Sequence, residues 1–102
     1  MPVAFVQEFA IRNGDRSTTN YDAISAQVNV REDWPEGCVF HTAGFDDDAG
    51  VFRIFEVWET REQSERFMRE RVMPLVEDLG GAGEAPPPER EARYDLHGFV
   101  AR

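Results

Sequence analysis

Two strand-forming segments in the middle of the chain lie only five residues apart, and this pair limits the possible folds most. Residues 38–45 (CVFHTAGF) and 51–59 (VFRIFEVWE) are rich in β-branched and aromatic residues. The intervening DDDAG at 46–50 is typical of a turn. A turn this short joins antiparallel strands, so the sequence predicts a central hairpin.

A strand and a helix are predicted before this hairpin. Residues 3–11 are apolar at both parities and contain no helix or strand breaker. Tyr21, Ile24 and Val28 repeat at helical spacing, which predicts a helix over about 19–32. The WPEG segment at 34–37 ends it.

A second helix and a last strand are predicted after the hairpin. Thr60 to Gln63 form a capping box that starts the helix. Pro74 lies inside the helical pattern and should kink or restart the helix there. Residues 81–90 are an extended linker rich in proline and glycine, and 91–100 form the last strand.

The resulting order, β-α-β-β-α-β, is the ferredoxin-like pattern of a four-stranded antiparallel sheet with two helices on one face. Its 102 residues form a single domain, 1–102. Because both parities of the first three strands are apolar, we expect the uncovered sheet face to meet a second copy. Two sheets facing each other would enclose a barrel.

Charge and composition exclude several functions. The net charge is −9, which disfavours binding to nucleic acids or to anionic membranes. All 11 basic residues are arginine, which excludes a lysine Schiff base and a P-loop. The single cysteine, Cys38, excludes an intrachain disulfide. With no signal peptide or long apolar run in view, we expect a cytoplasmic protein.

The succession Gly37-x-x-x-His41-x-Ala43, then Val57-Trp58-Glu59-Thr60-x-Glu62, Phe67 and Pro74-Leu75 resembles the dimeric α+β barrel superfamily, in its antibiotic-biosynthesis-monooxygenase-like branch. The resemblance covers nearly the whole chain. It implies a ferredoxin-like homodimer with a cleft between the sheet and the helices. Members include cofactor-independent monooxygenases, haem-degrading enzymes, isomerases and dechlorinases. The Asn–Trp–His arrangement of the haem-degrading members is not found here.

His41 is the candidate catalytic base, because it lies among apolar residues on the second predicted strand. A histidine that only bonds a neighbouring strand is the alternative. Glu56 and Trp58 share one face of the third strand, where Trp58 either stacks on a substrate or fills the core. A carboxylate at Glu56 needs a partner there, and Arg93 or Arg12 is the expected one.

Tyr21 and His97 complete the candidate substrate-binding set with Trp58 and Glu56. Tyr21 is expected at the mouth of the cleft. His41, Glu56 and His97 together could ligate a transition metal, but none of them lie close in sequence, so we expect no metal. The chain has no dinucleotide-binding fingerprint and no lysine, and its negative charge would repel flavin phosphates, so we also expect no flavin.

The function that these expectations favour is a cofactor-independent monooxygenase-like enzyme that acts on a planar or phenolic small molecule. Two alternatives stay open. One is a non-catalytic module for ligand binding or dimerisation, and the other is an isomerase or cyclase on the same barrel.

Overall fold

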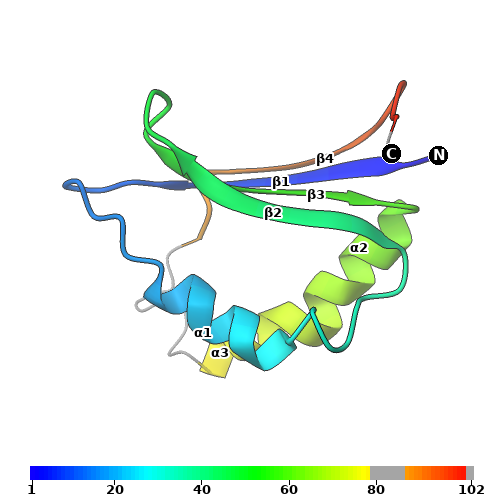
Figure 1. Ribbon diagram of the computed structural model, residues 1–102, viewed down its shortest axis with the longest axis horizontal. Helices are drawn as coiled ribbons and strands as arrows, with labels where there is room; N and C mark the ends of the chain where they lie inside the picture. Colours follow the sequence, from blue (N-terminus) through cyan, green and yellow to red (C-terminus); the bar gives the residue numbers. More distant parts are fainter. Residues whose placement is uncertain (79–86, 101–102) are drawn as a thin grey trace.

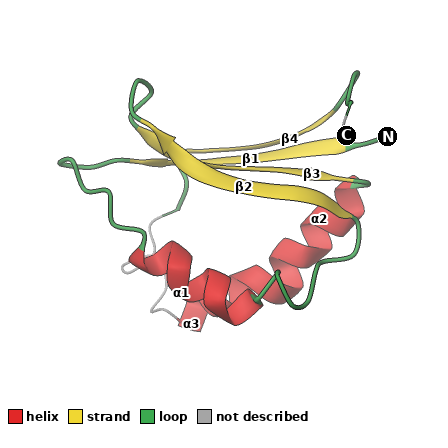
Figure 2. Ribbon diagram, viewed as in Figure 1, coloured by secondary structure: helices red, strands yellow, loops and turns green. Residues whose placement is uncertain are grey.

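A computed structural model describes residues 1–78 and 87–100, which form one sheet with helices on one of its faces (Figure 1). The elements occur in the order β1 (Val3–Ala10), α1 (Thr19–Val28), β2 (Cys38–Asp46), β3 (Val51–Trp58), α2 (Arg61–Phe67), the π-helix η1 (Met68–Val72), α3 (Met73–Asp78) and β4 (Arg90–Asp95). All pairs of neighbouring strands are antiparallel, in the order β2-β3-β1-β4. The predicted ferredoxin-like fold is therefore confirmed, and Figure 2 shows its two layers.

Two predicted boundaries are wrong. The first helix ends at Val28 rather than near residue 32, because Asn29 takes a left-handed conformation with φ 54°. The last strand ends at Asp95 rather than near residue 100. Asp95 pairs with Val3, the first residue of β1, so β4 has no further strand residue beside it. The predicted linker 81–90 falls mostly outside the described residues.

The second helical segment changes its winding before Pro74. In η1 the backbone N–H of Met73 bonds the carbonyl of Met68, five residues earlier. A proline ring collides with the carbonyl four residues before it in an α-helix, so a wider turn relieves the clash. The predicted restart at Pro74 takes the form of this π-helix, followed by α3.

The core is concentrated at one end of the sheet. Along β1, Val3 to Val6 are buried and the following four residues only half-buried. Along β3, Glu56 to Trp58 are buried, whereas the four residues from Phe52 to Phe55 are half-buried. The strand residues are thus less exposed at the end of the sheet where α2 packs and more exposed toward the other end. Across the described residues, no helix is long and apolar enough to span a membrane.

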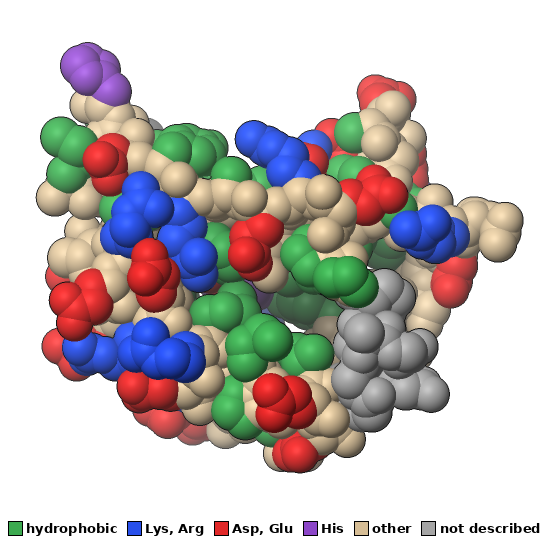
Figure 3. All heavy atoms as spheres, turned by 180° about the vertical axis from the view of Figure 1, so that it is seen from behind, with side chains coloured by type: hydrophobic (Ala, Val, Ile, Leu, Met, Phe, Trp, Pro, Cys, Tyr) green, Lys and Arg blue, Asp and Glu red, His purple; other side chains and the backbone are tan. Residues whose placement is uncertain are grey.

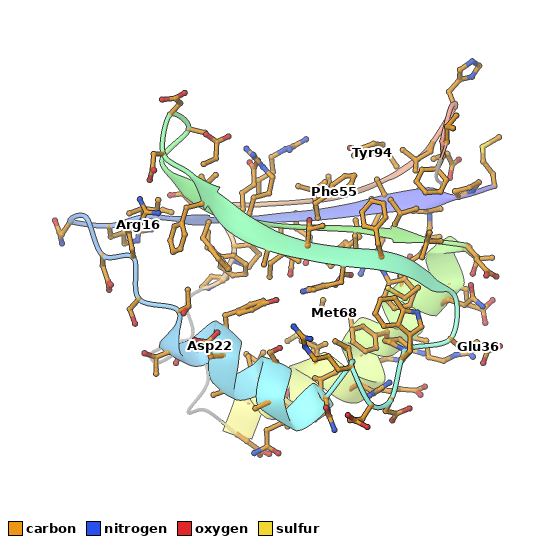
Figure 4. All side chains as sticks on the ribbon, in the orientation of Figure 1. Arg16, Asp22, Glu36, Phe55, Met68 and Tyr94 are labelled. Atoms are coloured by element: carbon orange, nitrogen blue, oxygen red, sulfur yellow. The ribbon has the colours of Figure 1, made fainter. Side chains whose placement is uncertain are left out.

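The outer face of the sheet, away from the helices, carries the other parity of apolar residues. Phe55 and Tyr94 point to this side (Figure 4). Phe40 lies 5.7 Å from Phe55 and 6.1 Å from Phe99, measured between ring centroids. Tyr94 and Phe99 remain 44% and 37% exposed. The described structure therefore leaves an aromatic surface open on this face.

The helix cap at Thr60 gives a test of how local signals stabilise this fold. The Thr60 hydroxyl accepts the backbone N–H of Gln63 at 3.2 Å. Thr60→Ala leaves that donor without its side-chain acceptor, so the free energy of unfolding should fall by about 1 kcal/mol. Urea denaturation measures the change, and Thr60→Ser should retain most of the stability. Equal stability of Thr60→Ala and wild type would contradict the cap.

Candidate functional site

Four of the five candidate residues come together in one hydrogen-bonded chain on the helix-facing side of the sheet. The Tyr21 hydroxyl lies 2.6 Å from His41 Nε2. His41 Nδ1 lies 2.5 Å from Glu56 Oε2, and the Trp58 indole N–H donates to Glu56 Oε1 at 2.9 Å. Residues from α1, β2 and β3 thus form one continuous polar chain.

Strand register explains how this chain forms. His41 on β2 and Glu56 on β3 are direct cross-strand partners, so their side chains leave the sheet side by side. A bulge between Cys38 and Phe40 shifts the register by one residue just before this pair. Glu56 precedes Trp58 by two residues on β3 and shares its face.

Glu56 is buried, with 5% of its surface exposed. Both of its carboxylate oxygens have a donor within the protein, one from His41 and one from Trp58. This corrects the expectation that Arg93 or Arg12 neutralises it: Arg93 bonds Ser64, and Arg12 pairs with Glu89. A buried carboxylate needs such donors because leaving its oxygens unpaired costs several kcal/mol.

The hydrogen bonds assign the proton on the imidazole. The Glu56 carboxylate is an acceptor, so Nδ1 of His41 carries the hydrogen and Nε2 is the acceptor for the Tyr21 hydroxyl. Burial, followed by the charges of Glu56 and Asp22, raises the pKa of Tyr21 above its ordinary value of 10.0. Tyr21 therefore stays a neutral donor at neutral pH.

The chain runs from the core to an accessible end. Trp58 is fully buried at 0% exposure, whereas the His41 side chain is 25% exposed and Tyr21 is half-buried. Trp58 therefore lies in the core rather than at the cleft wall, where a stacked substrate would have needed it. The Tyr21 ring meets Phe52 edge-on at 5.3 Å, and Phe52 packs on Phe45 at 4.9 Å.

His97 does not join the chain. It follows β4 and is exposed, so it does not lie beside His41 and Glu56 as a metal site would require. Within residues 1–78 and 87–100, no group of three His, Cys, Asp or Glu side chains could hold a metal ion.

Burial raises the pKa of Cys38 to about 12, so its thiol is a poor nucleophile at neutral pH.

Two hollows lie beside the helical layer. A small one of about 100 Å³ lies next to α2 and the loop before β2, where Pro35 and Phe67 form part of its wall. A larger open one, of about 540 Å³, lies between β4 and the helices and is lined in part by Met68 and Arg93. Figure 3 shows the molecule hollowed between the sheet and the helices, with hydrophobic side chains around the opening.

Solved structures with this architecture cover nearly the whole chain. SnoaB from Streptomyces nogalater, a cofactor-independent oxygenase, is 14% identical with a TM-score of 0.63 over 99% of this chain and 98% of its own. A proposed antibiotic biosynthesis monooxygenase from Chloroflexus aurantiacus is 16% identical with a TM-score of 0.63 over the same shares. The NE2512 protein of unknown function from Nitrosomonas europaea reaches 0.69 at 12% identity, over 99% and 94% of the two chains.

The fold is that of the antibiotic-biosynthesis-monooxygenase-like proteins. This confirms the resemblance expected from the sequence. No protein-family model and no curated protein sequence matches the chain. At these identities the likeness establishes the fold, and the chemistry has to come from the residues themselves.

Alkaline titration tests the environment of Tyr21. Its raised pKa predicts that the Tyr21 phenolate forms only above pH 10, and that Tyr21→Phe removes this late step from the ultraviolet titration. In the unfolded chain Tyr21 ionises near pH 10. The stability contributed by the neutral phenol is therefore present below pH 10 and lost as pH rises through the folded-state pKa. An unchanged late step in Tyr21→Phe would show that Tyr21 is not the shifted group.

Proposed function

We propose that this protein is a cofactor-independent monooxygenase-type enzyme that acts on a planar or phenolic small molecule, with His41 as its base. The observation that carries the proposal is the chain Tyr21–His41–Glu56–Trp58, which orients a histidine between a buried carboxylate and a half-buried phenol. The description of SnoaB as a cofactor-independent oxygenase supports the same chemistry on the same fold.

Each member of the chain has a separate task. Trp58 donates a hydrogen bond to one carboxylate oxygen of Glu56. The other oxygen of Glu56 accepts the hydrogen on Nδ1 of His41. This arrangement keeps Nε2 free of hydrogen and stabilises the imidazolium that forms when it accepts a proton. Tyr21 passes its own proton to Nε2 as it receives one from a substrate hydroxyl, so it is the residue that would touch the substrate.

The oxidation balances with dioxygen as the only co-reactant. Loss of a proton to the relay leaves a substrate anion, which gives one electron to O₂ and forms a radical pair. The pair joins as a peroxide anion, which takes the proton back from the relay and then eliminates water. A substrate methylene and O₂ thus become a carbonyl and H₂O. Phe52 and Phe45 provide apolar surroundings in which a flat aromatic substrate could pack beside Tyr21.

The proposed active form is a homodimer in the cytoplasm that binds neither nucleic acid nor membrane. Its second copy would cover the outer aromatic face of Phe40, Phe55, Tyr94 and Phe99. An open aromatic surface of this kind is uncommon on a monomer. The net charge of −9 argues against polyanionic partners.

Oxygen consumption with a panel of naphthols and hydroxyanthracenones tests the function. Wild type should consume one O₂ per carbonyl formed without added metal or flavin. His41→Gln should reduce the rate by about 100-fold or more, because general bases contribute that much. His97→Gln is the matched control and should retain the wild-type rate. Product without O₂ uptake would indicate an isomerase or cyclase, and binding without turnover a ligand-binding module.

Light scattering tests the dimer. Wild type should have about twice the chain mass of 11.7 kDa at micromolar concentration. Phe55→Glu places a charge in the centre of the outer face and should shift the mass toward one chain. Phe52→Glu would disrupt the helix-facing side instead, so the control is an exposed position, Asp48→Lys, which should remain dimeric. A wild-type monomer would remove this part of the proposal.

A further inference from the structure

One row of side chains crosses all four strands on the helix-facing side. His41 pairs with Glu56, Glu56 with Phe5, and Phe5 with Arg93. Neighbouring strands lie about 4.8 Å apart, so the Cα atoms of Glu56 and Arg93 are separated by about 10 Å. The row therefore has an acid–base pair at one end and a cation at the other.

The guanidinium of Arg93 is held in a defined orientation. Its Nε–H donates to Ser64 Oγ at 3.1 Å, and its Cζ lies 4.1 Å from the centre of the Phe5 ring. Ser64 and Phe5 are only 2% and 1% exposed, so both supports are fixed in the core. These contacts use Nε and the flat face of the guanidinium. They leave its two Nη nitrogens without a hydrogen-bond partner among the described residues.

Arg93 differs from the other half-buried arginines of the described residues. Arg53 pairs with Glu8 and Asp46, and Arg71 pairs with Asp33. Arg93 has no carboxylate partner among residues 1–78 and 87–100. An oriented guanidinium with its Nη edge unpaired suits a bidentate carboxylate.

Arg93 lines the hollow of about 540 Å³ between β4 and the helices. Met68 and Met73 give this hollow an apolar, adaptable wall. Its other lining residues are charged, with Glu65, Glu77 and Glu91 against Arg69. Glu91 accepts a hydrogen bond from Gln7, and Arg69 lies 3.7 Å from Glu70. Of the two cations in the described lining, Arg93 is therefore the one without an acidic partner among the described residues.

We propose that Arg93 binds the carboxylate of an aromatic acid whose apolar body packs on Met68 and Met73. The binding of this acid does not depend on the function proposed above, because the described lining of the hollow contains no member of the Tyr21–His41–Glu56–Trp58 chain. The three glutamates repel an anion elsewhere in the hollow, so the carboxylate is accepted only at Arg93.

Calorimetry with 2-naphthoate and its neutral analogue 2-naphthamide, at 0.15 M salt, tests the proposal. Wild type should bind the acid at least tenfold more tightly than the amide. In Arg93→Gln, which keeps a donor for Ser64, the two affinities should agree within about twofold. Arg90→Gln removes an exposed arginine from the same strand and should keep the wild-type preference.

Several results would overturn the proposal. One is equal affinity of wild type for the acid and the amide. Another is a higher affinity of wild type for the cation 2-naphthamidine than for 2-naphthoate, which would show that the glutamates of the hollow determine which charge it binds. A preference unchanged in Arg93→Gln would place the anion elsewhere. His41→Gln should still bind 2-naphthoate. Binding of 2-naphthoate by wild type, together with no turnover of any aromatic compound in the oxygen-consumption assay, would contradict the enzyme proposal and leave the anion site standing.

Discussion

The burial of one carboxylate organises the part of this molecule that contains the candidate site. Glu56 lies in the core, where an unpaired charge would cost several kcal/mol, so the fold has to bring donors to both of its oxygens. The Trp58 indole comes from the same strand and the His41 imidazole from the next. Once His41 is fixed in this way, its other nitrogen faces α1, and the Tyr21 hydroxyl ties that helix to the sheet.

Arg71 performs a related task at the far end of α1. Its guanidinium donates to the carbonyl of Val28, the last residue of the helix, and to the carbonyl of Asp33. The Val28 carbonyl is at the end of the helix, where carbonyls lack a partner within the helix, and a cation there also suits the helix dipole. Arg71 lies in η1, so the π-helix that Pro74 requires carries the side chain that anchors α1. The π-helix that accommodates Pro74 therefore also positions the Arg71 side chain that holds α1 against the second helical segment.

Much of the fold could be predicted because its signals are local. The hairpin, the cap at Thr60 and the period of each strand depend on neighbours in sequence, and these elements formed as expected. The need of Glu56 for a partner was also visible, since its strand neighbours Phe52, Ile54 and Trp58 are apolar. The partner's identity was not, because it depends on cross-strand register. A bulge between Cys38 and Phe40 decides that register, and no residue of the segment marks the bulge.

Successive side chains of a strand point to opposite faces of the sheet, so the helix-facing side and the outer face carry different sets of residues. In the sequence, both sets appear as one apolar pattern. On the helix-facing side, His41, Glu56, Phe5 and Arg93 form the row that contains the proposed base and the proposed anion site. One residue along each strand, Phe40, Val57, Ala4 and Tyr94 form the neighbouring row on the outer face. A strand that slipped by one residue would exchange the two rows and place Glu56 on the outer face. A second copy packed on the outer row would therefore hold in register the strands that align His41 with Glu56. Contact between copies and catalysis would then depend on the same hydrogen-bond ladder.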